Sequence, residues 1–322
     1  MKNAFDSLIK IGFSPVAGSL KPAAKGGSSR TFTMFLDAKA GACVLCEYSP
    51  EKEENFLYAD IAKFLKSCSI KAPEVLFHDP QTRTLVMSNL GGRDLSDFCA
   101  GAEEEQIENI YKKTLALAAA LHTRASAKFF ESPVKLMPKF DSALYCWEQN
   151  YFFENLVKDR LNLGVQKPEA EWKKLSEFIQ SFGECLIHRD LQSQNAIVSD
   201  GGGDVGFIDF QGMRLGCCWY DVGSLLFDPY QDVGSKARAE LFSYYCSIRG
   251  ADARECAPIF CAASAQRLMQ ALGAYAFLAD KKGKTAYLKY IPKALENLEL
   301  CAEAAGLEKT LAIAREAKKK LV

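Results

Sequence analysis

The chain is poor in histidine and has no excess of either charge. Its 322 residues include only three histidines, and 40 basic side chains balance 40 acidic ones, so the formal net charge is zero. A zero net charge gives no general attraction to nucleic acid or to an anionic membrane surface. We therefore expect neither kind of partner. The sequence gives no indication of an oligomeric state.

Long apolar runs are also missing. No uncharged apolar stretch reaches the roughly 18 residues that a membrane-spanning helix needs. The opening segment MKNAFDSLIKIGF lacks the apolar core and the small-residue cleavage site of a secretory signal. We therefore predict a cytoplasmic protein, long enough for two lobes that each bury a hydrophobic core.

A usable set of zinc ligands is absent as well. The chain has 12 cysteines, but the CxxC pair of Cys43 and Cys46 falls in a strand-like run, ACVLCEY, where positions three apart point to opposite faces. No second close pair of cysteines or histidines completes a four-ligand site. We expect no structural zinc, and reduced thiols that pack as small hydrophobes.

The first ninety residues or so have the alternation of strands. RTFTMFLD (30–37) and ACVLCEYS (42–49) are β-favouring runs joined by the turn-like AKAG, which predicts a hairpin. A helix is predicted over 51–67, and PEVLFH and RTLVMS predict a second hairpin. We therefore expect residues 1–88 to form a small lobe with an antiparallel sheet and one helix.

The segment NLGGRDL (89–95) interrupts this pattern and is predicted to link two lobes. Residues 96–322 are mostly of helical character, with helical periodicity at 103–123. Within them, NAIVSDGGGDVGFIDF consists of two short apolar runs around a Gly-rich turn, which predicts a hairpin. The predicted fold class is α+β, with a larger, mainly helical second lobe that contains this hairpin.

A dense polar cluster, LIHRDLQSQNAIV (186–198), leads into that hairpin. Asn195 begins the first predicted strand and Asp209 ends the second, so both lie at its open end, within reach of Asp190. Carboxylate and amide oxygens suit Mg²⁺, and a further carboxylate can accept a proton from a hydroxyl. Asp and Asn also occur in turns without any chemistry. However, HRDxxxxN followed by a DF at a strand end matches the kinase signature, which predicts phosphoryl transfer.

The segments LIHRDLQSQNAIV and VGFIDFQGMRLGCCWYDVGSLL resemble the aminoglycoside phosphotransferase family of small-molecule kinases. This resemblance implies a bilobal, protein-kinase-like fold and the cofactors ATP and Mg²⁺. The DFQ and YDVGSLL residues are similar to the cell-wall-recycling kinases that phosphorylate N-acetylmuramate and N-acetylglucosamine at the anomeric hydroxyl. The resemblance covers both lobes and is strongest over 186–228.

The resemblance also implies roles for matching residues. Asp190 would be the catalytic base, Asn195 and Asp209 would hold Mg²⁺, and His188 and Asp221 would brace the catalytic loop through hydrogen bonds. Main-chain groups of 88–90 would meet adenine, and the N–H groups of 26–29 would face the phosphates. The residues thus implied to bind ATP are Gly26, Gly27, Ser28, Ser29, Arg30, Met87, Ser88, Asn89 and Leu90.

One residue of the family pattern is missing. Such kinases usually carry a lysine on the strand expected at 42–49, paired with the phosphates and a helix glutamate, but no lysine lies between Lys39 and Lys52. Arg30 is the first candidate for the replacement cation. The alternative is an exposed arginine at a strand edge. The acidic residues that begin the next helix (51–54) also suit the helix dipole alone.

The interval after DFQ favours a small acceptor over a protein. Only GMRLGCCWY separates Gln211 from Asp221, without the longer phosphosite segment and A-P-E sequence of a regulated protein kinase. Trp147 and Glu148 on a helix expected at 141–156 suit a sugar, although an aromatic stripe on a helix also suits a core. Gln192 in the catalytic loop is a further candidate. Acidic residues are spread along the chain, which favours a neutral or anionic sugar over a polycationic aminoglycoside.

These observations together predict an ATP- and Mg²⁺-dependent sugar kinase. An aminoglycoside kinase or another small-alcohol kinase is the alternative within the same fold. A catalytically inactive nucleotide-binding scaffold is the alternative of a different class, because the strand lysine is missing.

Overall fold

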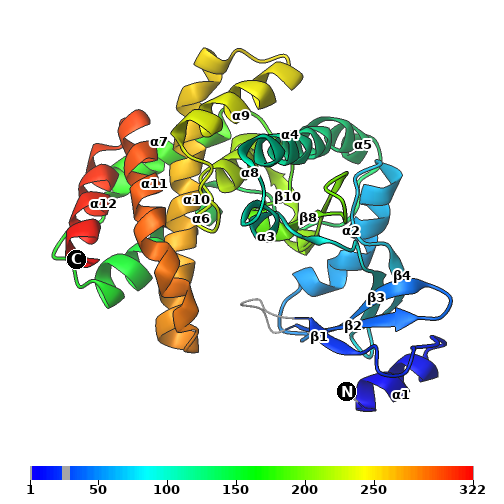
Figure 1. The fold of residues 1–322 in the computed structure, drawn as a ribbon. Helices are drawn as coiled ribbons and strands as arrows, with labels where there is room; N and C mark the ends of the chain where they lie inside the picture. The colour runs from blue at the N-terminus through cyan, green and yellow to red at the C-terminus, as the bar shows by residue number, and fades with distance from the viewer. Residues whose placement is uncertain (1, 24–29, 322) are drawn as a thin grey trace.

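The computed structural model describes residues 2–23 and 30–321, and its first part contains a helix, α1, followed by an antiparallel sheet (Figure 1). The strands run in the order β1-β2-β3-β5-β4. Both predicted hairpins are confirmed, and the pairing of β2 with β3 joins Phe32 to Cys46 and Asp37 to Gly41. The elements of this part are α1 (Lys2–Lys10), β1 (Lys21–Ala23), β2 (Thr31–Asp37), β3 (Gly41–Glu47), α2 (Glu54–Ser67), β4 (Val75–Asp79) and β5 (Thr84–Ser88).

The turn between β2 and β3 is held by its own residues. Asp37 Oδ1 accepts hydrogen bonds from the N–H groups of Lys39 and Ala40, each at 2.9 Å. Gly41 follows with a φ of +77°, a backbone conformation that a residue without Cβ adopts at low cost. Local side-chain acceptors and one glycine therefore close the hairpin.

The two faces of the sheet pack against different helices. Cys43 belongs to a buried cluster with Leu8 of α1, whereas Cys46 belongs to the main core, which includes Leu57 and Ile61 of α2. The two cysteines thus lie on opposite faces of β3, as their spacing predicts. This arrangement places α2 between the sheet and the helical part of the chain (Figure 1).

The rest of the chain is mainly helical and is organised around one long helix, α10 (Ala253–Lys282). Asp252 caps this helix by accepting from the N–H groups of Arg254 and Glu255, and α10 packs against α6, α8 and α11. The other helices are α3 (Leu95–Cys99), α4 (Glu104–Ala120), α5 (Ser126–Glu131), α6 (Ser142–Phe152), α7 (Glu169–Gln180), α8 (Cys218–Leu226), α9 (Ser235–Ile248), α11 (Ile291–Ala304) and α12 (Glu308–Leu321).

Short segments with other helical geometry complete this part. Two have the wider π-helical turn and continue α4 and α6 directly, and three are 3₁₀ turns. These segments are η1 (Leu121–Ala125), η2 (Phe153–Arg160), η3 (Ser193–Asn195), η4 (Phe210–Gly212) and η5 (Thr285–Tyr290).

The predicted second-lobe hairpin is confirmed as β8 (Ala196–Val198) paired with β9 (Val205–Phe207). A two-residue strand, β6 (Arg93–Asp94), pairs with β8, so the second half of the segment predicted as a linker joins this small sheet. Gly92 precedes it at such close approach that a Cβ would lie 1.8 Å from the carbonyl oxygen of Val198. A second pair, β7 (Cys185–Ile187) with β10 (Arg214–Gly216), flanks the catalytic loop.

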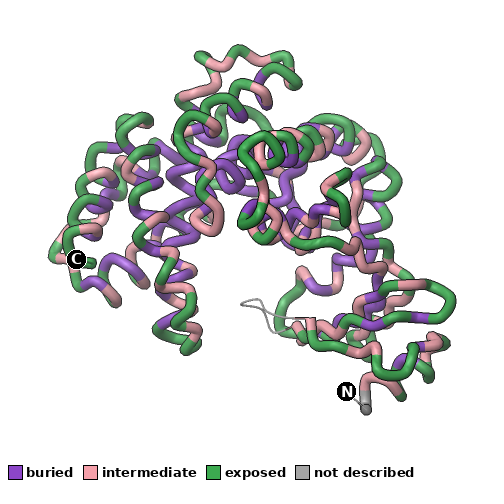
Figure 2. The backbone as a smooth tube through the Cα atoms, viewed as in Figure 1, coloured by how far each residue is buried: buried purple, intermediate pink, exposed green. Residues whose placement is uncertain are grey.

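Most buried residues belong to one large core that runs from the inner face of the sheet through α10 and α11, with exposed residues on the outer faces of the helices (Figure 2). Among the described residues, no helix has the length and apolar character to cross a membrane. The core therefore lies directly beneath β7 and the catalytic loop, whose residues Leu186, Ile187 and Leu191 are fully buried.

Candidate active site

The loop after β7 is anchored from below by Asp221 of α8. Its carboxylate accepts hydrogen bonds from the main-chain N–H groups of His188 (2.6 Å) and Arg189 (2.9 Å), and His122 Nε2 lies 3.0 Å from the same carboxylate. His188 Nε2 lies 2.9 Å from the carbonyl oxygen of Ile208, which can only accept. His188 and Asp221 are thus placed as the braces that the sequence predicts.

Asp190 presents its carboxylate beside two arginines. Arg189 Nη1 donates to Oδ2 at 2.5 Å, and Arg267 Nη2 of α10 lies 3.4 Å from Oδ1. Burial favours the neutral acid, but the charges of Arg189 and Arg267 outweigh it and hold the pKa of Asp190 at about 2. Asp190 is therefore ionised at neutral pH, with both oxygens engaged.

Asn195 and Asp209 meet at the open end of the β8–β9 hairpin. The N–H group of Ile208 donates to the carbonyl of Asn195 at 3.0 Å, which joins the two segments there. Asn195 Nδ2 donates to the carbonyl of Asp190 at 2.8 Å, which fixes the amide and leaves Oδ1 as a possible ligand. Asp209 has a left-handed backbone, with a φ of +62°. These bonds join the segments that carry Asp190, Asn195 and Asp209, and the convergence of the three side chains on one metal ion and acceptor stays a prediction.

The oxygen atoms at this place fit Mg²⁺. Asp209 offers a carboxylate and Asn195 an amide oxygen, the hard ligands that this ion takes together with water and phosphate oxygens. No group of three or more His, Cys, Asp or Glu residues within the described ranges could hold a metal ion by itself. A magnesium ion here would complete its shell from the nucleotide and water.

Arg30, just before β2, forms an ion pair with Asp209 across 179 residues of sequence. Its side chain is only 10% exposed, so the alternative of an exposed strand-edge arginine is wrong. Burial lowers the pKa of Arg30, but the charge and hydrogen bond of Asp209 outweigh this and raise it. Arg30 is therefore a charged group inside the site, in direct contact with a candidate metal ligand.

The segment predicted to meet adenine follows β5. The N–H group of Ser88 donates to the carbonyl of Glu74 (2.8 Å), and that of Asn89 donates to the carbonyl of Ala42 (2.9 Å). Met87 is buried behind this edge, where its sulfur accepts from the hydroxyl of Tyr58 at 3.2 Å. The N–H groups of Ser88 and Asn89 are thus already bonded within the protein. The N–H group of Leu90 is the next one along the chain that is predicted to meet adenine. Gly26, Gly27, Ser28 and Ser29 lie outside the described residues, and their contact with phosphates stays a prediction.

The three acceptor candidates lie in different surroundings. Gln192 Oε1 is 3.5 Å from Arg267 Nη2, beside Asp190. Trp147 is 50% exposed and stacks on Tyr151, with ring centroids 5.0 Å apart. Glu148 is fully buried: Oε1 accepts from Tyr220 (2.8 Å) and Oε2 from Gln266 (3.0 Å). The expectation that Glu148 meets the acceptor is therefore wrong, because both oxygens of its carboxylate are hydrogen-bonded inside the core.

Sequence reasoning missed three arginines around Asp190, namely Arg189, Arg214 and Arg267. Arg189 stands within the HRD motif, but the motif alone does not indicate that its side chain bonds to Asp190. Arg214 opens β10 with 7% exposure, and Arg267 lies in the middle of α10 with 6% exposure. Arg267 also donates to Ser224 Oγ at 3.1 Å and to Gln270 Oε1 at 2.5 Å. No motif marks it, since a helix that is buried along most of its length gives an arginine no distinctive periodicity.

A small, partly enclosed hollow borders the catalytic loop. Asp228 lines it together with Gln192, Arg267 and Tyr275. Its carboxylate accepts from the N–H groups of Ser193 (2.6 Å) and Tyr230 (2.9 Å). Burial raises the pKa of Asp228 to about 6, against these hydrogen bonds. Asp228 therefore holds the end of the catalytic loop as a buried, titratable group.

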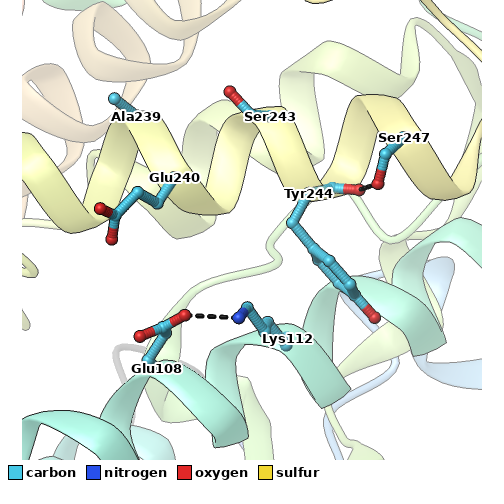
Figure 3. A pocket seen from close by; sticks show the side chains of 7 residues that line it. All are labelled: Glu108, Lys112, Ala239, Glu240, Ser243, Tyr244 and Ser247. Carbon is cyan, nitrogen blue, oxygen red and sulfur yellow. Dashed lines mark hydrogen bonds and ion pairs between the residues drawn. The ribbon is translucent and has the colours of Figure 1, made fainter.

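A more open hollow between α4 and α9 contains none of the predicted site residues (Figure 3). Glu108 and Lys112 form an ion pair along α4, and Tyr244 and Glu240 of α9 face them. The ammonium group of Lys112 lies 5.8 Å from the centre of the Tyr244 ring. Lys112 is thus paired with Glu108, and this hollow lies apart from the predicted catalytic loop.

A model described as the phosphotransferase enzyme family matches residues 19–259. The chain is also similar to the N-acetylmuramate/N-acetylglucosamine kinase of Caulobacter vibrioides, with 26% identity over 251 residues, which are 74% of this chain and 68% of that protein. The range matched by the family model includes the predicted catalytic loop and the β8–β9 hairpin.

Solved structures share the architecture. An ethanolamine kinase of Plasmodium vivax covers 93% of this chain and 86% of its own, with a TM-score of 0.63 and 16% identity. An aminoglycoside phosphotransferase with bound ADP covers 94% of this chain and 98% of its own, with a TM-score of 0.59 and 16% identity. The predicted protein-kinase-like fold class is therefore confirmed.

Proposed function

Because the chain belongs to the phosphotransferase enzyme family, whose members are ATP-dependent kinases of small molecules with hydroxyl acceptors, we propose that its acceptor is an amino sugar. N-acetylglucosamine and N-acetylmuramate are the leading candidates. The observation that carries this proposal is the pair of arginines on Asp190, Arg189 and Arg267. We also propose the division into a nucleotide-binding lobe (1–88), a linker (89–95) and a catalytic lobe (96–322).

In the proposed reaction, Asp190 orients the acceptor hydroxyl and accepts its proton. The acceptor oxygen forms a bond to the γ-phosphorus, the bond from that phosphorus to the β,γ-bridging oxygen breaks, and ADP leaves. Asp190 is ionised at neutral pH. It can take the proton of the acceptor hydroxyl once one of its carboxylate oxygens is no longer bonded to an arginine. The 3.4 Å contact with Arg267 is the longer of the two and is the easier one to open.

Asn195 and Asp209 would hold Mg²⁺, which when bound neutralises charge on the phosphoryl oxygens. The bond from Asn195 Nδ2 to the main chain of Asp190 supports this, because it couples the metal side of the site to the position of the base. Arg30 is proposed as the cation that replaces the missing strand lysine. It would turn from Asp209 to the phosphates of ATP when Asp209 takes the metal ion.

The two guanidinium groups beside Asp190 favour a neutral or anionic acceptor over a cationic one. Ethanolamine and aminoglycosides carry protonated amines at neutral pH, and these would approach two guanidinium groups that already bind the base. Like charges brought together in a partly buried site cost free energy. A neutral or anionic sugar meets no such repulsion. Family membership alone leaves the acceptor open, and this local charge supports the sugar.

The direct test is an acceptor panel assayed by ADP release with Mg²⁺ and ATP. We expect turnover with N-acetylglucosamine and N-acetylmuramate, and none above background with ethanolamine or a polycationic aminoglycoside. Asp190→Asn serves as the inactive control. Faster turnover of an aminoglycoside than of either sugar would overturn the proposal. ATP binding with no turnover of any acceptor would favour the inactive scaffold.

A further inference from the structure

Arg214 is a buried cation with no carboxylate of its own. It is 7% exposed, its Nε donates to the carbonyl of Gly212 at 3.1 Å, and its guanidinium lies 5.3 Å from the centre of the Phe140 ring. Within the described part of the chain, the ion pairs of nearby arginines go to Asp190 and none joins Arg214. A buried charge without a counter-ion is costly. Such a group marks a place where an anion is expected to bind.

Arg214 and Arg189 meet at one residue, Gly212. The carbonyl of Gly212 accepts the bond from Arg214. A Cβ on Gly212 would lie 3.8 Å from Oε2 of Glu54 and 3.9 Å from Cδ of Arg189. The Arg189 side chain is 21% exposed and reaches Asp190. Arg214 therefore lies next to Arg189, the arginine that bonds to the carboxylate of Asp190.

Arg214 differs from the neighbouring arginines in its charged contacts. The guanidinium groups of Arg189 and Arg267 contact the carboxylate of Asp190. Arg267 also lines a small hollow together with Asp228. Glu148 is enclosed, and its oxygens are taken by Tyr220 and Gln266. Burial lowers the pKa of Arg214, and the positive charge of Arg189 lowers it further. Among the described residues, Arg214 is therefore the arginine of this group without a carboxylate in ion-pair contact.

We propose that Arg214, together with Arg189, binds a carboxylate on the acceptor and thereby selects a carboxylate-bearing amino sugar over its neutral counterpart. This inference rests on the proposed function. N-acetylmuramate and N-acetylglucosamine are a matched pair for it, because the first is the second with a lactyl ether that carries a carboxylate. A planar carboxylate can accept two parallel N–H bonds from a guanidinium group.

Binding of that carboxylate would also act on the base. A carboxylate that engages Arg189 competes with Oδ2 of Asp190 for the same N–H groups, because Arg189 now donates to that oxygen. Asp190 would then have a free oxygen for the acceptor hydroxyl. The acceptor's own anionic group would thus prepare the base, and the neutral sugar would lack this effect.

The test is steady-state kinetics of Arg214→Gln with the two sugars at saturating Mg²⁺ and ATP. We expect kcat/KM for N-acetylmuramate to fall about 10- to 100-fold, the scale of a lost charge-assisted hydrogen bond, and kcat/KM for N-acetylglucosamine to fall less than about threefold. Arg214→Lys keeps the charge and is expected to recover part of the preference. Thermal unfolding of each variant verifies that it folds.

Arg238→Gln is the matched control. Arg238 is also buried, its Nε donates to a carbonyl (Leu226, 2.8 Å), and its guanidinium lies 4.4 Å from the centre of the Phe227 ring. It differs in having a carboxylate partner, Asp232 at 3.1 Å. Its substitution is expected to change the two sugars' kcat/KM by the same factor.

Three other results would overturn the inference. Equal losses for both sugars in Arg214→Gln would make Arg214 a structural residue. A raised KM for ATP with an unchanged sugar preference would assign the anion to a nucleotide phosphate. No turnover of either sugar by the unaltered protein would refute the proposed function itself. The two preceding outcomes can be observed only if the unaltered protein is active, so they are distinguishable from this one.

Discussion

Tyr58 of α2 stacks on Phe210 at the start of η4, with ring centroids 4.5 Å apart and ring planes inclined by 29°. The Tyr58 hydroxyl donates to the sulfur of Met87 on β5. One fully enclosed side chain therefore joins the helix of the first part, the edge proposed to meet adenine, and the segment that carries Asp209.

We predict that Tyr58→Leu lowers the free energy of unfolding by about 1–3 kcal/mol, because it removes the ring stack and leaves part of its volume empty. Tyr58→Phe keeps the ring and is expected to cost less than about 1 kcal/mol, since only the bond to a weak sulfur acceptor is lost. Urea unfolding of both variants measures the difference. Equal losses of unfolding free energy in the two variants would show that the hydroxyl of Tyr58, and not its ring stack on Phe210, provides the stabilisation.

Asp190→Asn is expected to fold like the unaltered protein and to lose about 10²- to 10⁴-fold in kcat, because an amide cannot accept the proton. Its carbonyl oxygen can still accept one arginine hydrogen bond. ADP release under saturating substrates measures turnover, and calorimetry measures ATP binding. Retained turnover near the unaltered rate would exclude Asp190 as the base.

Arg30→Gln is expected to raise KM for ATP about tenfold, because one charge-assisted hydrogen bond to the phosphates is lost. Without the ion pair, Asp209 is freer for the metal, so Mg²⁺ should bind the nucleotide-free variant more tightly. Titration with Mg²⁺ and a separate ATP titration distinguish the two effects. An unchanged KM for ATP would remove Arg30 as the replacement for the missing lysine.

Removal of the metal gives an independent test of Asn195 and Asp209. Turnover is expected to stop when EDTA exceeds Mg²⁺ and to return when Mg²⁺ is added back. In Asp209→Asn, the Mg²⁺ concentration for half-maximal rate is expected to rise by about tenfold or more, because a charged ligand becomes neutral. A rate that is independent of Mg²⁺ would contradict the assignment.

Asp228 makes stability depend on pH in a definite direction. Burial raises its pKa from 3.8 to about 6, so the folded state keeps a proton that the unfolded state has already released. Its stabilising contribution is therefore complete below about pH 4 and is lost as pH rises to about 6. Relative to Asp228→Asn, the unaltered protein should lose roughly 3 kcal/mol across that window. Unfolding of both proteins at several pH values measures this difference, and parallel curves would contradict it.

Much of the fold follows from local signals in the sequence. The β2–β3 hairpin was predictable because Asp37 and Gly41 supply the turn and the flanking residues alternate. The helix expected over 51–67 is present as α2, which starts three residues later, at Glu54. The strand β6 was missed, since two residues, Arg93 and Asp94, show no periodicity.

The arginines of the site were hidden for physical reasons. Arg189 turns onto its own neighbour because its φ is +77°, a local conformation that its residue type does not indicate. Arg267 meets Asp190 across 77 residues of chain. Glu148 was misplaced because helical spacing does not show whether a carboxylate faces outward or toward a partner such as Gln266, which lies 118 residues away. The motif residues were predictable, whereas their long-range partners depend on the tertiary fold.

The arginines that bond to Asp190 are also expected to affect how fast the protein hydrolyses ATP when no acceptor is bound. A water molecule that attacks ATP needs the same carboxylate oxygens to take its proton, and both are bonded when no acceptor is present. The idle enzyme is thus expected to hydrolyse ATP slowly, which a blank reaction without acceptor measures. Nucleotide consumption would then follow the supply of acceptor, and a cell could keep this protein at high abundance without draining its ATP.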